Sequence, residues 1–199
     1  MLLIRKENGS VSNFKLVEQS ALNQRYFTLG DISVQVVKDQ ALVSFAIPNG
    51  KRKEVNDAIK QSYNTTLPKI GLSVKSETDH TQFLGMQAEQ FLMLFNYKDN
   101  RAVEQVKSRL NALVYLCDQS DSWVMLRIRG KGCRTALERI CAIDLYKTSF
   151  PQGSVARTTM EHLAVIILHE SDDQYLLMSP RSSAESFLHS ITQSIENIS

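Results

Sequence analysis

The chain has 199 residues, of which 43% are hydrophobic and 22% charged, so it can bury a core as one domain or as two small ones. Its formal net charge of +2 argues against a protein that binds nucleic acid or anionic lipid through an overall positive field. The longest apolar run, residues 163–168, is far shorter than the ~20 residues of a membrane-spanning helix, and residues 1–4 are too short for a signal peptide. We therefore expect a cytoplasmic protein with no membrane or nucleic-acid partner.

The first half of the chain alternates short strands with two helices. Residues 1–24 are polar and lack a period, which predicts an N-terminal arm ahead of a single compact unit at residues 25–199. Apolar alternation predicts strands, while the spacing of Val55, Ala58 and Ile59 predicts a helix. The predicted strands are residues 32–36, 41–47, 70–74, 83–85 and 90–95, and the predicted helices are residues 54–63 and 101–110.

The second half follows the same pattern. In the strand that begins at Trp123, the side chains of Val124 and Leu126 lie on one face, and those of Trp123 and Met125 lie on the other. If all helices cover the first face, the second face has no cover within the chain and is expected to meet a partner. The predicted strands are residues 113–116, 123–128, 155–168 (as more than one piece) and 174–178, and the predicted helices are residues 133–143 and a last helix opened by Ser182.

The two halves resemble each other in the order of their elements. A strand, the break Pro48-Asn49-Gly50 and a helix correspond to a later strand, the break Gly130-Lys131-Gly132 and a helix. The segments Gln90-Phe91-Leu92-Met93 and Gln174-Tyr175-Leu176-Leu177 correspond as well, at a similar offset of roughly 80 to 85 residues. This offset predicts an internal duplication, with halves at about 25–112 and 113–199. We expect an α+β fold with a mainly antiparallel sheet, helices on one face and pseudo-twofold symmetry.

Residues 150–159 form the run around which the second half is organised. Pro151 fixes φ at about −65° and Gly153 tolerates a positive φ, so residues 151–153 predict a turn. This turn is expected to set the angle at which the next strand enters the sheet. Ser182 and Glu185 have the spacing of a capping box, which predicts that Ser182 caps the last helix.

Residues that could carry chemistry are few and scattered. Gly130-Lys131-Gly132-Cys133 lacks the spacing of a phosphate-binding loop, and its thiol is expected to be buried. The three cysteines form no Cys-x-x-Cys pair and the four histidines no ligand pattern, so we expect no disulfide, catalytic residue, cofactor-binding residue or metal. The basic run at residues 127–139 fits a solvated face or a protein interface better than a nucleic-acid surface, because acids interleave and stacking aromatics are missing.

Three spaced motifs resemble those of one family. They are Asp144-Leu145, Phe150-Pro151-Gln152-Gly153-Ser154-Val155-Ala156-Arg157-Thr158, and Ser179-Pro180-Arg181-Ser182 before the last helix. Together they resemble the gamma subunit of heterotetrameric sarcosine oxidase, whose fold is similar to the folate-binding module of the glycine-cleavage T-protein. The resemblance covers residues 30–191. It departs from the family at Gly85-Met86, where the family has Gly-Pro, and at Phe187-Leu188-His189-Ser190, where the family's helix is richer in aromatics.

The resemblance implies a non-catalytic subunit with a structural or assembly role. The complex would demethylate sarcosine oxidatively to glycine, with hydrogen peroxide and either formaldehyde or methylene-tetrahydrofolate as products. Its alpha, beta and delta subunits are the implied partners, and they would carry FAD, FMN, NAD, tetrahydrofolate and zinc. The positions assigned to the family motifs, as structural or interface residues, are Pro151, Gly153, Ser154, Arg157, Thr158, Pro180, Arg181 and Ser182.

Two other functions remain open at this point. One is a free-standing folate-binding one-carbon enzyme or an iron–sulfur maintenance factor of the same fold, because Lys131-Gly132-Cys133 resembles a motif of such a factor, although Arg134-Thr135-Ala136 then departs from it. The other, weaker one is an RNA-modification accessory module. A folate enzyme predicts a concave pocket lined by aromatics and one acid, whereas a subunit predicts a broad apolar patch.

Overall fold

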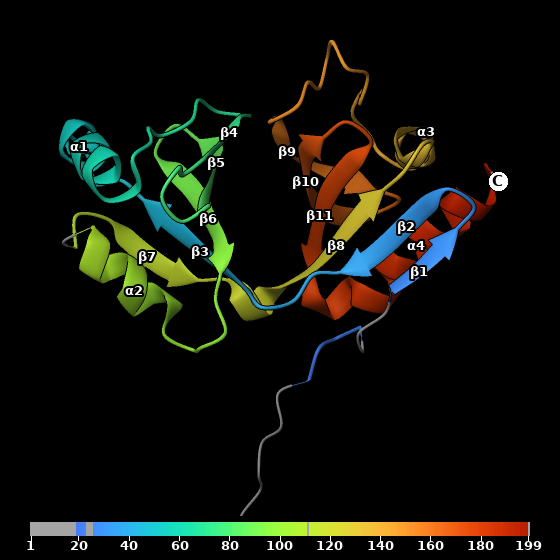
Figure 1. The fold of residues 1–199 in the computed structure, drawn as a ribbon, viewed down its shortest axis with the longest axis horizontal. Coiled ribbons are helices and arrows are strands. Elements are labelled where there is room, and N and C mark those ends of the chain that lie inside the picture. The colour runs from blue at the N-terminus through green and yellow to red at the C-terminus, as the bar shows by residue number, and fades with distance from the viewer. Residues whose placement is uncertain (1–18, 23–25, 111, 199) are drawn as a thin grey trace, which may run out of the picture.

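A computed structural model describes residues 19–22, 26–110 and 112–198, which form two antiparallel β-sheets with helices on their outer faces (Figure 1). The α+β class with antiparallel pairing is confirmed, but the strands form two sheets rather than one. Most of the predicted arm at residues 1–24 lies outside the described residues. Within the described part, Leu22 is fully buried in a hydrophobic core.

The first half builds the smaller sheet, in the strand order β4-β5-β6-β3-β7. Helix α1 places Val55, Ile59 and Tyr63 four residues apart on one buried face, as the periodicity predicts. The elements of this sheet and its helices are β3 (Gln40–Ala46), α1 (Arg52–Tyr63), β4 (Ser73–Lys75), β5 (Gln82–Gln87), β6 (Gln90–Asn96), α2 (Ala102–Arg109) and β7 (Tyr115–Asp118).

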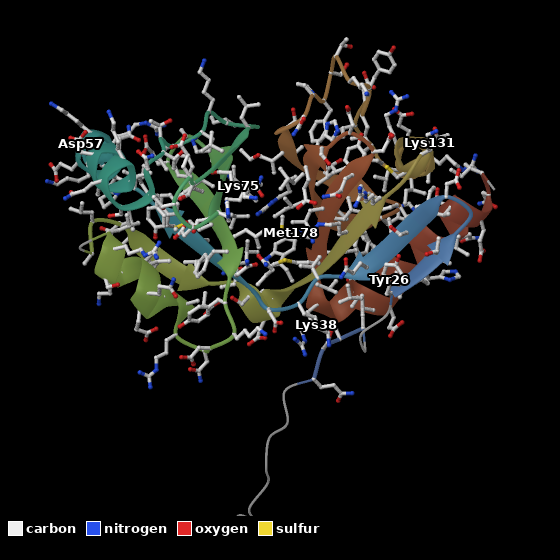
Figure 2. The ribbon with its side chains drawn as sticks, viewed as in Figure 1. Tyr26, Lys38, Asp57, Lys75, Lys131 and Met178 are labelled. Carbon is white, nitrogen blue, oxygen red and sulfur yellow. The ribbon has the colours of Figure 1, made fainter. Side chains whose placement is uncertain are left out.

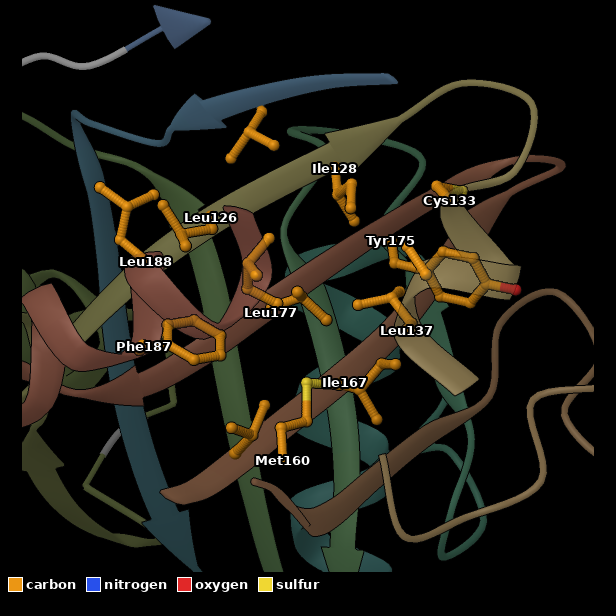
Figure 3. Packing of buried hydrophobic residues seen from close by; sticks show 14 of the residues in the cluster. Leu126, Ile128, Cys133, Leu137, Met160, Ile167, Tyr175, Leu177, Phe187 and Leu188 are labelled. Carbon is orange, nitrogen blue, oxygen red and sulfur yellow. The ribbon is translucent and has the colours of Figure 1, made fainter. Parts of the chain in front are cut away.

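The second half builds the larger sheet, in the order β1-β2-β8-β11-β10-β9. On one face of this sheet Leu126, Ile167 and Leu177 are buried beneath its helices, and Phe187 of the last helix lies in the same cluster (Figure 3). The elements of this sheet, its helices and its turns are β1 (Tyr26–Leu29), β2 (Ile32–Val36), the 3₁₀ turn η1 (Ser120–Ser122), β8 (Trp123–Arg129), α3 (Cys133–Glu138), β9 (Val155–Met160), β10 (Leu163–Ser171), β11 (Gln174–Pro180), the 3₁₀ turn η2 (Arg181–Ser183) and α4 (Ala184–Glu196).

The two sheets face each other, so the molecule has four layers with helices outermost (Figure 1). A third core fills the space between the sheets, and Met178 lies within it, near the middle of the molecule (Figure 2). Met125, on the face predicted to lack a cover, is buried in this core, and Trp123 packs against it. The expectation of an uncovered face is therefore wrong, because the smaller sheet covers this face of the larger sheet.

The second half repeats the topology of the first. The order β9-β10-β11-β8 matches β4-β5-β6-β3, and α3 and α4 follow the same strands as α1 and α2. Trp123 begins β8 83 residues after Gln40 begins β3, and Gln174 begins β11 84 residues after Gln90 begins β6. This arrangement is what an internal duplication predicts.

The strand that precedes each repeat crosses to the other sheet. β2 comes directly before β3 in the chain, yet it pairs with β8 of the other half. β7 comes directly before β8, yet it pairs with β3. The larger sheet therefore contains two strands of the first half, β1 and β2, and the smaller sheet contains one strand of the second half, β7, so neither sheet can form completely without the other half.

The predicted helix at residues 133–143 is too long. α3 ends at Glu138, because the following segment becomes extended and runs beside β9. Cys141 forms an isolated bridge with Met160, and the amide of Ala142 donates to the carbonyl of Thr159 at 3.1 Å. Pairing with a strand edge here replaces the continuation of the helix.

The predicted capping box at Ser182 is also wrong. α4 begins at Ala184, and its N-cap residue, Ser183, makes no side-chain capping hydrogen bond. Ser182 instead lies in η2, where the amide of Ala184 donates to the carbonyl of Arg181. The 3₁₀ turn thus leads the chain into the helix.

Candidate functional site

The turn at residues 151–153, predicted as the centre of the second half, lies where the two halves meet. The amide of Ser154 donates to the carbonyl of Pro151 at 3.0 Å, which closes the turn. Gly153 has φ of +86°, a value that favours glycine, as predicted. The turn is tied to β10, because the amide of Gly153 donates to the carbonyl of His169 and the amide of His169 donates to the carbonyl of Ser154, both at 2.9 Å.

The first half contains the same turn at residues 69–72. The amide of Leu72 donates to the carbonyl of Lys69 at 3.1 Å, and Gly71 has φ of +78°. The amide of Gly71 donates to the carbonyl of Gly85, and the amide of Gly85 donates to the carbonyl of Leu72, both at 2.9 Å. Each bond has its counterpart in the second half, so Gly71 corresponds to Gly153 and Gly85 to His169.

The two turns pair with each other across the boundary between the halves. The amide of Ser73 donates to the carbonyl of Gly153 at 2.7 Å, and the amide of Val155 donates to the carbonyl of Gly71 at 2.9 Å. Leu72 and Ser154 thereby form an isolated antiparallel bridge. We call residues 69–73 and 151–155 together the junction. The backbone bonds of the junction are reciprocal, as the predicted pseudo-twofold symmetry would require.

The junction departs from symmetry at the positions of Gly85 and His169. A Cβ atom on Gly85 would lie 2.3 Å from the carbonyl oxygen of Lys69, so the first turn sits too close to β5 for any side chain. In the second half, the His169 ring is buried and stacks on Tyr175, with ring centroids 4.6 Å apart. Its Nδ1 atom lies 2.9 Å from the carbonyl oxygen of Phe150, which makes Nδ1 the donor.

The remaining motif residues lie outside the junction, in two different places. Arg157 and Thr158 continue along β9, and the Arg157 guanidinium lies 5.9 Å from the centroid of the Trp123 ring. Pro180, Arg181 and Ser182 lie at the far end of β11, a distance of roughly 17 Å along the strand from Tyr175. The eight predicted positions therefore do not form one site.

Arg181 borders a wide polar groove at that far end. Its Nη2 atom donates to the carbonyl of Gln19 at 2.5 Å, and its Nη1 atom lies 3.7 Å from Oδ1 of Asp121. The groove has a volume of about 1090 Å³, and its lining comes from the ends of strands and from the connections between them, with Tyr97 and Trp123 among the lining residues. Sequence reasoning missed it, because its lining comes from several chain segments far apart in sequence.

Several ionisable groups that could serve catalysis have structural partners. Arg127 forms a two-pronged ion pair with Glu170, with distances of 2.6 and 2.8 Å. Arg109 pairs with Asp79 and lies over the Tyr63 ring. These side chains hold neighbouring elements together.

The predicted burial of Cys133 is confirmed. Its side chain is fully buried beside α3 (Figure 3), and burial raises the pKa of the Cys133 thiol to about 12. The thiolate, which is the reactive form, is therefore scarce at neutral pH. Within residues 19–22, 26–110 and 112–198 no three His, Cys, Asp or Glu side chains are grouped so as to hold a metal ion, and none of the helices described there could span a membrane.

The fold matches solved structures, although the sequence matches no known family model and no curated protein. A chain of heterotetrameric sarcosine oxidase from Corynebacterium sp. U-96 superposes with a TM-score of 0.72 and 15% identity, over 83% of this chain and 84% of that one. Glycine cleavage system aminomethyltransferase T from Bartonella henselae superposes with a TM-score of 0.64 and 12% identity, over 81% of this chain and 45% of that one. This chain therefore shares the fold of both proteins and spans less than half of the aminomethyltransferase.

Proposed function

We propose that this chain is a non-catalytic, gamma-type subunit of a heterotetrameric sarcosine oxidase, with a role in holding the complex together. The observation that carries the proposal is the match to one chain of such an oxidase over similar shares of both chains, 83% and 84%. Similar shares mean that the two chains have nearly the same length. The motif around Pro151, Gly153 and Ser154 supports the same assignment, since it resembles the gamma subunit in sequence.

Under this proposal the chemistry belongs to the other subunits. The alpha, beta and delta subunits would hold FAD, FMN, NAD, tetrahydrofolate and zinc, and would convert sarcosine to glycine in the cytoplasm. The structural use of Arg127, Glu170 and Cys133 in this chain supports that division. So does the packing between the sheets, where Leu84, Ile166 and other apolar side chains are buried against one another.

A folate-binding enzyme of the same fold is the second candidate. The likeness to aminomethyltransferase T favours it, and so do Trp123 and Tyr97 in the wall of the polar groove. Against it, the groove carries four aspartates rather than one acid, and it is wide and open to solvent. Titration with tetrahydrofolate, followed by quenching of Trp123 fluorescence, separates the candidates: the folate enzyme predicts saturable binding to the isolated chain.

The experiment that tests the subunit proposal is reconstitution. The purified chain alone should not oxidise sarcosine and should contain no flavin by absorbance. Alpha, beta and delta subunits produced without it should gain yield or thermal stability when it is added back. Turnover of sarcosine or a flavin spectrum from the isolated chain would refute the non-catalytic assignment, and the absence of any effect on the other subunits would refute the assembly role.

A further inference from the structure

Two apolar side chains are exposed at the junction. Ile70 is 62% exposed and Leu72 is 41% exposed, and they lie on either side of Gly71 in the turn of the first half. Single exposed apolar residues are ordinary and carry no functional meaning. These two differ because the backbone between them is fixed to β5 and to the second half by hydrogen bonds of 2.9 Å from the amides of Gly71, Gly85 and Val155.

The second half provides an internal comparison for both positions. By the reciprocal hydrogen bonds, Ile70 corresponds to Gln152 and Leu72 to Ser154. The same turn therefore forms with polar side chains at both places. The backbone bonds of the turn therefore do not require Ile70 or Leu72, and covering the exposed part of these two side chains by another surface would be favourable.

The surroundings of this pair are basic. Lys69 and Lys75 lie on the same segment, both are exposed, and Lys75 is labelled in Figure 2. No carboxylate of residues 19–22, 26–110 and 112–198 forms a salt bridge with either ammonium group. In the second half, by contrast, Lys147 pairs with Asp172 at 2.9 Å. An apolar pair between two uncompensated lysines is complementary to an apolar segment that carries carboxylates.

We infer that Ile70 and Leu72, flanked by Lys69 and Lys75, form the contact through which this chain binds an acidic, apolar segment of another subunit of the complex. The inference rests on the proposed function and names the surface that it uses. A rigid turn suits this role, because little conformational entropy is lost when its side chains are covered. Binding would bury the two side chains and bring carboxylates to the two ammonium groups.

The test compares variants that copy the second half. Ile70→Gln with Leu72→Ser places in the first turn the residues that the second turn already tolerates, so its thermal midpoint should stay within about 2 °C of the unchanged protein. Binding is measured by biolayer interferometry to alpha, beta and delta subunits produced together without this chain. The matched control is Tyr115→Gln, because Tyr115 is 70% exposed on β7, away from the junction.

The double variant should raise the Kd at least about tenfold, while Tyr115→Gln leaves it unchanged. Lys69→Glu with Lys75→Glu should weaken binding and reduce its dependence on salt. An unchanged Kd for the double variant, with the unchanged protein binding normally, overturns this inference and leaves the proposed function standing. Failure of the unchanged protein to bind overturns the proposed function and the inference with it. Self-association that the double variant abolishes would assign the surface to a second copy and also overturn the inference.

Discussion

Replacing Gly85 by alanine tests whether the junction holds the two halves together. The new Cβ atom would lie 2.3 Å from the carbonyl oxygen of Lys69 and 2.9 Å from its carbonyl carbon. Both are backbone atoms, so no side-chain rotation relieves the contact. The turn at residues 69–72 must move away from β5, which separates the Gly85 amide from the carbonyl of Leu72 and the Gly71 amide from the carbonyl of Gly85.

The expected loss of stability follows from those contacts. Two backbone hydrogen bonds contribute about 1 kcal/mol each, and overpacking adds about 1–3 kcal/mol, so a loss of about 3–5 kcal/mol is expected. For a chain of this length that corresponds to a fall of roughly 6–20 °C in the thermal midpoint. If the turn also guides the pairing of the halves, the urea transition should become less cooperative as well.

Gly153→Ala is the matched control, because it changes the other turn without the clash. A Cβ atom there would make ordinary contacts with the carbonyl oxygen of Ser73 at 3.8 Å and its Oγ at 3.9 Å, so the cost is the strain of a positive φ, about 1–2 kcal/mol. Urea unfolding of both variants, followed by circular dichroism and by Trp123 fluorescence, gives the comparison. A Gly85→Ala variant as stable as Gly153→Ala would refute the reasoning.

Three further predictions concern single side chains. Gly153→Val should cost about 1–3 kcal/mol, because φ there is +86°; an unchanged thermal midpoint would show that the glycine is merely tolerated. Burial acts to raise the pKa of the Asp79 carboxyl, but hydrogen bonds from Arg109 and Thr81 outweigh it and lower that pKa from 3.8 to about 2. Asp79→Asn should therefore lower the free energy of unfolding by about 1–2 kcal/mol at pH 7. This difference from the unchanged protein should vanish between about pH 4 and pH 2, where the native carboxylate takes up its proton. A difference that stays constant from pH 7 to pH 2 would contradict the ion pair. Iodoacetamide at pH 8 should modify exposed Cys117 well before buried Cys133, with all cysteines reacting in urea; equal rates in the native protein would contradict the burial of Cys133.

Local pattern identified most elements of this fold. Alternation of apolar residues in β3 and β8 reflects burial on two faces, and the break at Pro48-Asn49-Gly50 marks the end of a strand. The turn at Pro151 and Gly153 was predictable because its chemistry is local: one residue fixes φ and the other permits a positive value. The similar residue-number offsets between corresponding elements of the two halves were also visible in the sequence, because those elements follow one another at similar distances along the chain in each half.

What the sequence could not show is which strands pair. Alternation in β2 looks the same whether its neighbour is β3 or β8, so the exchange of strands and the presence of two sheets were hidden. For the same reason Met125 was expected to be uncovered. The end of α3 was misjudged because Cys141 and Ala142 pair with β9, a contact distant in sequence. Tertiary pairing overrides helix propensity at such places.

The polar groove and the junction surface were missed for a related reason. Trp123, Tyr97 and Arg181 come from three parts of the chain, and only the fold brings them together. Ile70 was assigned to a predicted strand at residues 70–74, where an apolar residue is expected to be buried. In the structure β4 begins at Ser73, and Ile70 lies exposed in a turn instead.

The most direct test of the subunit assignment is the native mass of the assembled complex. The chain, of 22.5 kDa, is tagged and co-expressed with alpha, beta and delta subunits of a sarcosine oxidase, and the purified material is examined by native mass spectrometry. The account predicts one heterotetramer with a single copy of this chain, which carries flavin and oxidises sarcosine. Recovery of the tagged chain alone at 22.5 kDa, while the other three subunits assemble into an active oxidase without it, would contradict the account.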